Sequence, residues 1–410
     1  MADGIKQRMQ SGTKSLDVFV FGGCGHVGLP LGMMLAKAGL QVGAYDLDES
    51  RRETVRSGRM PFLEYGAETV LPAVLGSSFH LLDDDSRLEE ADYVVVTIGT
   101  PVDEYLNPRF QPMFDLARQI APRLRADQHL MLRSTVYPGT TRELQRTLEG
   151  LGSSVEVSYC PERIVQGYAI SELDRLPQIV SAITQDGVET ALRLWQRLTD
   201  RLIVVEVEEA ELAKLFLNAW RYIQFAIANQ FYMVAEELGA DFFSIHRAMT
   251  EGYDRASDLP LPGFTAGPCL LKDTMQLSAF QRGNFQLGHA AMLVNEGLAN
   301  FIVDSLRARH PDLAEKRVGI LGMAFKANID DVRDSLAYKL RKILRFHGAE
   351  VVCADAFVDD PSFVSAEELV ATCDVVVVGA PHDLYQGLDI PAGVDLVDVW
   401  GFFRKQPVVA

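Results

Sequence analysis

The sequence predicts an α/β protein with two Rossmann-like, doubly wound domains joined by a long central helix and a helical middle region. Three observations predict this fold class. A strand-like run enters a glycine-rich turn at residues 17–28, no proline or glycine interrupts residues 208–238, and a second strand-like run enters a glycine turn at residues 317–322. Strand, glycine turn and helix in succession are typical of nucleotide-binding α/β domains. We therefore expect three domains, at residues 1–205, 206–312 and 313–410.

The composition indicates a globular protein and argues against several classes of partner. The chain has 410 residues, of which 48% are hydrophobic, and a formal net charge of -17. A chain of this length is too long for a single ordinary hydrophobic core. Its negative charge would repel a nucleic acid. The first 15 residues are polar and no run of about 18 apolar residues occurs, so we expect a cytoplasmic protein without a membrane segment. Five scattered cysteines without a CxxC pair predict a reducing compartment and no metal site.

Eight apolar runs separated by helical stretches predict a mainly parallel sheet in the first domain. These runs lie at residues 17–22, 41–46, 78–82, 92–98, 129–133, 155–158, 178–183 and 202–206.

The turn after the first run, Gly23-Cys24-Gly25-His26-Val27-Gly28, predicts a dinucleotide site. Gly23 permits the tight turn, Gly25 lets the backbone approach a pyrophosphate, and Gly28 lets the helix pack against the strand. Asp46 ends the next strand 18 residues after Gly28. Its carboxylate can accept both ribose hydroxyls and would repel a 2′-phosphate, so we expect NAD as the cofactor. The alternative is a glycine-rich turn that binds nothing.

The rest of the chain predicts a helical region and a second α/β domain. The helix at residues 208–238 ends at Gly239 and would span about 45 Å, a length typical of domain bridges and subunit interfaces. Strand-like runs follow at residues 317–322, 349–354 and 374–379. Because Gly322 is followed by Met-Ala-Phe-Lys without a third glycine, we expect no dinucleotide at this second turn.

Several residues carry candidate chemistry. Cys269 follows a loop rich in glycine and proline and stands at a predicted helix start near Lys272. Both features favour a nucleophilic thiolate, and a buried inert thiol is the alternative. Lys214 and Asn218 share a helix face within an apolar stretch, where they are either oxyanion donors or part of a solvated face.

Polar loops after predicted strands add further candidates. Residues 134–141 follow one strand, where a doubly wound sheet places its ligand crevice. Glu162 follows another strand and is either a general base or the partner of Arg163 in a loop salt bridge. The cations of residues 325–335 either hold phosphates or are ordinary surface charge.

These motifs, in this order, resemble the UDP-glucose/GDP-mannose dehydrogenase family over about residues 16–400. The motifs that carry the resemblance are GCGHVGLPLG at 23–32, GTP at 99–101, STVYPGTT at 134–141, PER at 161–163, ELAKLFLNAWR at 211–221, PGFTAGPCLLKD at 262–273, GMAFKANIDDVRDS at 322–335 and GAPH at 379–382. The resemblance implies oxidation of a nucleotide-sugar C6 alcohol to a carboxylate, with two NAD and no metal, in polysaccharide biosynthesis. It also implies a homodimer formed through the long helix and a UDP-sugar site in the C-terminal domain.

The resemblance assigns roles to individual residues. It implies that Cys269 is the nucleophile, that Lys214 and Asn218 stabilise an oxyanion, and that Asp273 works with an ordered water. Glu162 would act as acid or base in thioester hydrolysis, with Thr135 positioning the water. Cofactor contacts are implied for Gly23, Gly25, His26, Val27, Gly28, Asp46, Arg51, Thr100, Pro101, Thr135 and Arg333. Substrate contacts are implied for Glu162, Arg163, Lys214, Asn218, Arg255, Phe264, Gly267, Phe325 and Lys326.

The substrate signals differ from one motif to another. Pro-Glu-Arg, with Arg163, resembles the branch that oxidises UDP-N-acetylhexosamines such as UDP-ManNAc or UDP-GlcNAc, whereas Cys-Leu-Leu-Lys-Asp resembles the UDP-glucose branch. Pro268 before the cysteine and Gln166 at a usual glutamate position depart from the family pattern. We expect a UDP-N-acetylhexosamine, with UDP-glucose as the alternative. A two-electron hydroxyacid dehydrogenase and an inactive NAD-bound sensor are the remaining alternatives.

Overall fold

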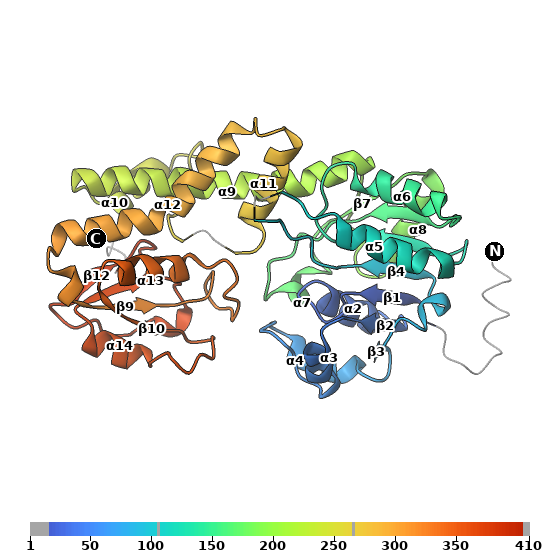
Figure 1. The fold of residues 1–410 in the computed structure, drawn as a ribbon, viewed down its shortest axis with the longest axis horizontal. Coiled ribbons are helices and arrows are strands. Elements are labelled where there is room, and N and C mark those ends of the chain that lie inside the picture. Colours follow the sequence, from blue (N-terminus) through green and yellow to red (C-terminus); the bar gives the residue numbers. More distant parts are fainter. Residues whose placement is uncertain (1–15, 105–106, 265–266, 405–410) are drawn as a thin grey trace. The chain divides into compact units, whose positions relative to one another are not determined.

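The chain forms two compact units. A computed structural model gives the positions of residues 16–104, 107–264 and 267–404. The first unit runs to Lys214 and the second begins at Leu215, so the boundary falls inside the long helix α9 (Val207–Leu238) (Figure 1). This helix confirms the one predicted at residues 208–238, and it ends where Gly239 adopts a left-handed φ of 71°.

The first unit contains an eight-stranded sheet in the order β3-β2-β1-β4-β5-β6-β7-β8. Its strands are β1 (Val18–Phe21), β2 (Val42–Tyr45), β3 (Phe79–Leu81), β4 (Tyr93–Val96), β5 (His129–Leu132), β6 (Glu156–Tyr159), β7 (Gln178–Ala182) and β8 (Leu202–Val204). Every pairing is parallel except that of β6 with β7, which confirms the mainly parallel sheet. The strand order reverses between β1 and β4, and the ligand crevice of such sheets lies at this reversal.

Helices cover both faces of this sheet. They are α2 (Gly28–Lys37), α3 (Glu49–Arg56), α4 (Ala67–Val74), α5 (Gln111–Ile120), α6 (Thr140–Gly150), α7 (Ala169–Glu172) and α8 (Gln185–Trp195), with short 3₁₀ turns η1 (Leu88–Glu90) and η2 (Ala121–Arg123). Val18 and Val20 of β1 pack in one apolar cluster with α2, α4 and α8. Phe19 and Phe21 point to the opposite face and pack with α5 and α6. The alternation along one strand therefore fills two cores.

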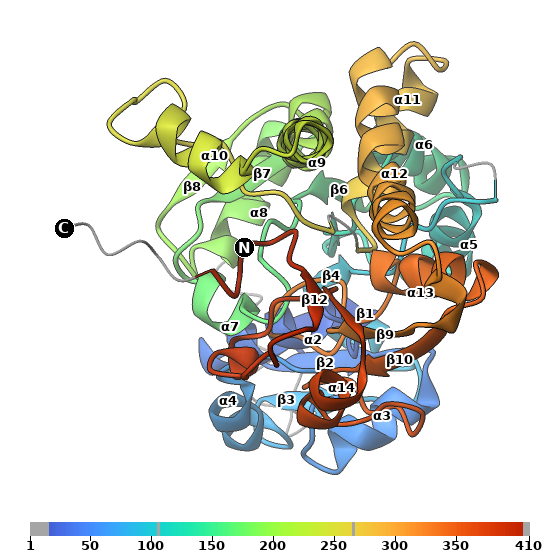
Figure 2. The same cartoon turned by 90° about the vertical axis from the view of Figure 1, so that its left-hand side faces the viewer.

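The second unit contains a four-stranded parallel sheet in the order β10-β9-β11-β12. Its strands are β9 (Arg317–Leu321), β10 (Glu350–Ala354), β11 (Val375–Val378) and β12 (Asp395–Val397). Its helices, besides α9, are α10 (Phe242–Thr250), α11 (Leu270–Phe280), α12 (Gln286–Arg309), α13 (Leu336–Phe346) and α14 (Ala366–Thr372), with 3₁₀ turns η3 (Leu313–Glu315) and η4 (Asp383–Tyr385). Helices α13 and α14 lie on opposite faces of the sheet (Figures 1 and 2).

Candidate active site

The glycine turn joins β1 to α2 and is closed by backbone packing. A Cβ on Gly23 would lie 2.7 Å from the Cβ of Ala44, and a Cβ on Gly28 would lie 2.2 Å from the carbonyl oxygen of Gly22. A Cβ on Gly25 would meet only that same oxygen, at 3.4 Å. Gly23 and Gly28 are therefore required by the fold, whereas Gly25 is uncrowded on the side where a Cβ would lie, which fits the close approach of a pyrophosphate at the start of α2.

Asp46 is half-buried beside this turn. Its Oδ2 accepts the backbone N–H of Cys24 and its Oδ1 accepts that of Asp48, both at 3.0 Å. A carboxylate has about four acceptor positions, so each oxygen keeps one for a ribose hydroxyl. Arg51, in the first turn of α3, forms an exposed ion pair with Asp48. These residues fit an NAD ribose.

His26 of the turn contacts the loop that follows β6. Its ring stacks on Phe62 with 3.9 Å between ring centroids, and its Nδ1 lies 3.3 Å from Nε2 of Gln166. Val27, the next residue, is half-buried. The residue that departs from the family pattern, Gln166, therefore joins the 161–166 loop to the glycine turn.

Two further loops meet at the carboxyl ends of β4 and β5. The hydroxyl of Thr100 donates to the carbonyl oxygen of Thr135 at 2.6 Å, and the hydroxyl of Ser134 donates to that of Ile98 at 2.6 Å. Thr135 is half-buried and Pro101 is exposed. The structure thus brings Thr100 and Thr135 together.

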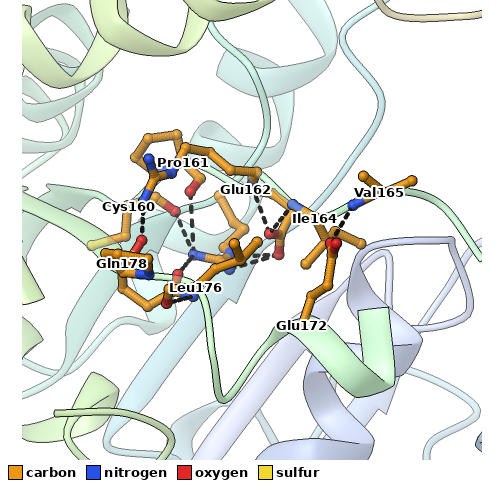
Figure 3. A network of polar contacts seen from close by, with 11 residues as sticks. Cys160, Pro161, Glu162, Ile164, Val165, Glu172, Leu176 and Gln178 are labelled. Carbon is orange, nitrogen blue, oxygen red and sulfur yellow. Dashed lines mark hydrogen bonds and ion pairs between the residues drawn. The ribbon is translucent and has the colours of Figure 1, made fainter. Parts of the chain in front are cut away.

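The carboxylate of Glu162, on the loop that follows β6, is buried and held on both oxygens (Figure 3). Oε2 accepts from Nη2 of Arg133 at 2.6 Å and from its Nε at 3.1 Å. Oε1 accepts the backbone N–H groups of Arg163, at 2.7 Å, and Ile164, at 2.9 Å. The guanidinium of Arg163 instead donates to the carbonyl oxygen of Pro177. The salt bridge considered between the side chains of Glu162 and Arg163 is therefore wrong, and Arg133 is the ion-pair partner.

Sequence reasoning missed Arg133. The signal was a single arginine directly after the apolar strand His129–Leu132. A charge at the end of a fully buried strand needs a buried partner.

In the second unit, Cys269 is the N-cap residue of α11, as the loop composition predicted. The backbone N–H of Asp273 donates to the carbonyl oxygen of Cys269 at 2.8 Å. The Asp273 carboxylate is fully buried. Its Oδ2 accepts from the amide of Asn218 at 2.5 Å. Its Oδ1 lies 2.8 Å from Nζ of Lys272, without the alignment of a hydrogen bond. Asn218 of α9 and Lys272 thus hold Asp273 one turn after the cysteine.

Exposure distinguishes Cys269 from the other four cysteines, which are all buried. Burial, followed by the charge of Asp46, raises the pKa of Cys24 to about 12. Burial also raises the pKa values of Cys160, Cys353 and Cys373. A thiol with a raised pKa is a poor nucleophile at neutral pH, so Cys269 is the candidate that remains.

The cysteine loop packs against the segment that follows β9. Gly267 has φ of +100°, and a Cβ there would lie 2.6 Å from the ring of Phe325, so only glycine fits. The guanidinium of Arg333 pairs with Asp331 at 2.5 Å. Burial lowers the pKa of Arg333, but the bond to Asp331 and the negative charge of a Cys269 thiolate outweigh this and raise it. Gly267 therefore contacts Phe325, and Arg333 lies within range of the charge of Cys269.

The remaining predicted residues of the second unit take different positions. Phe264 is buried, and the backbone N–H of Gly263 before it donates to Asn229 Oδ1 of α9 at 2.8 Å. Lys326 is half-buried. Arg255 is exposed in the turns after α10 and forms no hydrogen bond or ion pair with the residues that the structure describes. Thr265 and Ala266 of the cysteine motif lie outside the described residues.

The predicted catalytic residues are divided between the units. Thr135, Glu162 and the half-buried Lys214 belong to the first, whereas Asn218, Cys269 and Asp273 belong to the second. Within residues 16–104, 107–264 and 267–404, no three His, Cys, Asp or Glu side chains are placed to hold a metal ion. No helix in the same ranges has the length and apolar character needed to cross a bilayer.

Three consecutive parts of the chain match one protein family. Residues 17–199 match the NAD binding domain of the UDP-glucose/GDP-mannose dehydrogenase family, residues 208–297 match its central domain, and residues 319–405 match its UDP binding domain.

Curated and solved relatives are similar over most of the chain. A UDP-N-acetyl-D-mannosamine dehydrogenase of Methanocaldococcus jannaschii is 27% identical over 90% of this chain and 86% of its own. An NDP-N-acetyl-D-galactosaminuronic acid dehydrogenase of Ralstonia nicotianae is 26% identical over 90% of this chain and 91% of its own. The solved structure of a UDP-glucose dehydrogenase from Pyrobaculum islandicum has a TM-score of 0.87 and 26% identity, covering 95% of both chains.

Proposed function

Because the chain belongs to the UDP-glucose/GDP-mannose dehydrogenase family, we propose that it oxidises the C6 alcohol of a UDP-N-acetylhexosamine to a carboxylate. The chain is an NAD-dependent nucleotide-sugar dehydrogenase. The proposal adds the sugar, the four-electron outcome and the covalent route through Cys269.

One observation carries the covalent route, namely the exposed thiol of Cys269 one helical turn before the buried Asp273, which Asn218 and Lys272 hold. The thiol of Cys269 adds to the C6 aldehyde, so that an S–C bond forms and the carbonyl oxygen takes a proton. Oxidation of this adduct gives a thioester. Water then attacks the thioester carbon, the C–S bond breaks and the thiolate leaves. NAD, when bound, accepts the hydride in each of the two oxidations.

The other residues of the site would serve individual steps. The amide of Asn218 has two protons, and one is used on Asp273, so the second can stabilise the oxyanion together with Lys214. Glu162 takes a proton from the attacking water, which Thr135 positions. We also propose that the reaction occurs in the reducing cytoplasm, because Cys269 must stay a thiol.

The choice of an N-acetylhexosamine rests on two supports. The curated relatives from Methanocaldococcus jannaschii and Ralstonia nicotianae are both named for N-acetyl sugars. Arg163 adds a guanidinium beside the Glu162 loop, where it is half-buried. UDP-glucose is the second candidate, since the Pyrobaculum islandicum enzyme shares the fold with a TM-score of 0.87.

The deciding experiment measures NADH release with UDP-ManNAc, UDP-GlcNAc, UDP-glucose, UDP-galactose and GDP-mannose. We expect the highest kcat/KM with an N-acetyl sugar and two NADH per sugar. Cys269→Ser should abolish turnover, because a serine alkoxide forms with difficulty. The matched control Cys353→Ser changes a buried cysteine of β10 and should retain turnover. A Cys269→Ala enzyme that still releases two NADH would contradict the covalent route.

We further propose a homodimer formed through α9, within a chain organised as an NAD domain at residues 1–205, a central part at 206–312 and a UDP-sugar domain at 313–410. Seven large apolar side chains of α9 are exposed, namely Phe216, Leu217, Trp220, Ile227, Phe231, Val234 and Leu238. An apolar surface of this kind is typical of an interface between chains.

A further inference from the structure

Arg133 is a fully charged side chain in the interior of the first unit. It directly follows β5, and its side chain is completely buried. Moving a guanidinium out of water is costly unless every direction of its charge is matched. The contacts of Arg133 therefore identify the anion that balances its buried charge.

Each part of the guanidinium has a fixed partner. Nε and Nη2 both donate to Oε2 of Glu162. Nη1 donates to Oε1 of Gln178 on β7 and to the carbonyl oxygen of Cys160 on the loop after β6, both at 3.0 Å. The ring of Trp195 on α8 covers the guanidinium, with 4.2 Å from Cζ to a ring centroid. The cation cannot turn away from Glu162 without losing its bonds to β7 and to the loop after β6, together with its ring contact on α8.

The contacts of Glu162 are equally complete. Arg133 supplies two bonds to Oε2, and the backbone N–H groups of Arg163 and Ile164 supply two to Oε1. These four bonds fill the four or so acceptor positions of a carboxylate. All four bonds come from donors, and together they fix the plane of the carboxylate.

Glu162 can accept a proton from water only if one of these four bonds gives way. A water can approach only where a bond opens, and the Nε bond of Arg133, at 3.1 Å, is the longest of the four. The shorter Nη2 bond would then keep the carboxylate in place while it takes the proton.

We propose that Arg133 is the positioning residue for Glu162 and, through it, sets the rate of the hydrolysis step of the proposed reaction. The inference rests on the proposed function and adds a residue to it. Arg133 has no part in either oxidation, so its loss should separate hydrolysis from the hydride steps.

The test uses Arg133→Lys, which keeps the charge but replaces the planar fork with a single ammonium. The full-length enzyme is mixed with NAD and its best UDP-sugar, and NADH is followed by stopped flow while intact-protein mass spectrometry detects the covalent adduct. We expect a burst of NADH at nearly the wild-type rate, then turnover at least about tenfold slower, with the enzyme–sugar nucleotide adduct accumulating. Arg142→Lys is the matched control, because Arg142 also pairs with a glutamate, Glu208, but on a partly exposed face.

Two further measurements keep a folding defect apart from this role. Arg133→Met leaves Glu162 buried without its cation and should unfold at a lower temperature, and adding Glu162→Gln should restore part of that loss. The double variant should accumulate adduct as Glu162→Gln alone does, because both changes act on one step.

The possible outcomes are distinct. An Arg133→Lys enzyme with wild-type turnover overturns the inference, and so does one in which burst and turnover fall together without an adduct. If the wild type releases two NADH per sugar in these experiments, the proposed function stands. If the wild type releases no NADH with any nucleotide sugar, the proposed function fails, and the inference fails with it.

Discussion

Replacement of Asn218 by alanine tests whether this amide both holds Asp273 and stabilises an oxyanion. Its side chain is 5% exposed and donates at 2.5 Å to a carboxylate that is 0% exposed. Loss of a hydrogen bond to a charged group costs about 1.5–3 kcal/mol. At about 2–4 °C per kcal/mol for a unit of this size, Tm should fall by roughly 3–12 °C. Loss of an oxyanion donor should lower kcat by about 10²–10³.

The assay compares kcat at 25 °C, where the variant remains folded, with the Tm from differential scanning fluorimetry. Ser278→Ala is the matched control, because Ser278, on α11, is likewise buried and its hydroxyl lies 3.1 Å from Nε2 of His289. We expect the control to lower Tm and leave kcat within a few-fold of wild type. An Asn218→Ala enzyme that loses stability but keeps kcat would refute the oxyanion role and leave Asn218 as a support for Asp273.

Three further predictions concern the cofactor, the dimer and pH. Asp46→Ala should weaken NAD binding in calorimetry by about 1.5–3 kcal/mol, the cost of lost bonds to a charged group, and admit NADP; a wild type that uses both cofactors equally would contradict this. Trp220→Lys, at a position 54% exposed on α9, should give a monomer in light scattering where wild type is a dimer, and a monomeric wild type would contradict the interface. Burial, helped by the charge of Arg193, lowers the pKa of His129 to about 4, against about 6.5 when unfolded. Because the unfolded state binds the extra proton, the free energy of unfolding should fall by about 3 kcal/mol as pH drops from 6.5 to 4. Denaturant titrations at several pH values should show that the free energy of unfolding of His129→Leu lacks this dependence on pH. A pH dependence equal to that of the wild type would contradict the prediction.

The features that the sequence predicted correctly are local. Strands β1 to β11 lie in apolar runs bounded by turn residues, and the start of α11 follows from the loop before Cys269. The partner of Glu162 was not predictable in this way, because Arg133 is 29 positions earlier. The two meet only because β5 and β6 pair in parallel and end at the same sheet edge. Strand β12 was missed because three residues, Asp395–Val397, carry too short a pattern to recognise.

The two glycine turns of the chain differ in how many acceptor positions the nearby aspartate keeps free for a ligand. Asp355, at the end of β10, accepts the backbone N–H groups of Met323 and Ala324 and lies 3.1 Å from Nε2 of the buried His382, all on Oδ2. Its Oδ1 accepts two more backbone N–H groups, from residues 357 and 358. Five contacts exceed the four or so acceptor positions of a carboxylate, whereas Asp46 uses only two. Nδ1 of His382 accepts the backbone N–H of Asn328, so the neutral ring must carry its proton on Nε2 and donate it to Asp355. Asp355, the acid that would bind a ribose, thus has no acceptor position left for a ribose hydroxyl. The second turn is therefore suited to a ligand held by its backbone and cations and not to a second dinucleotide.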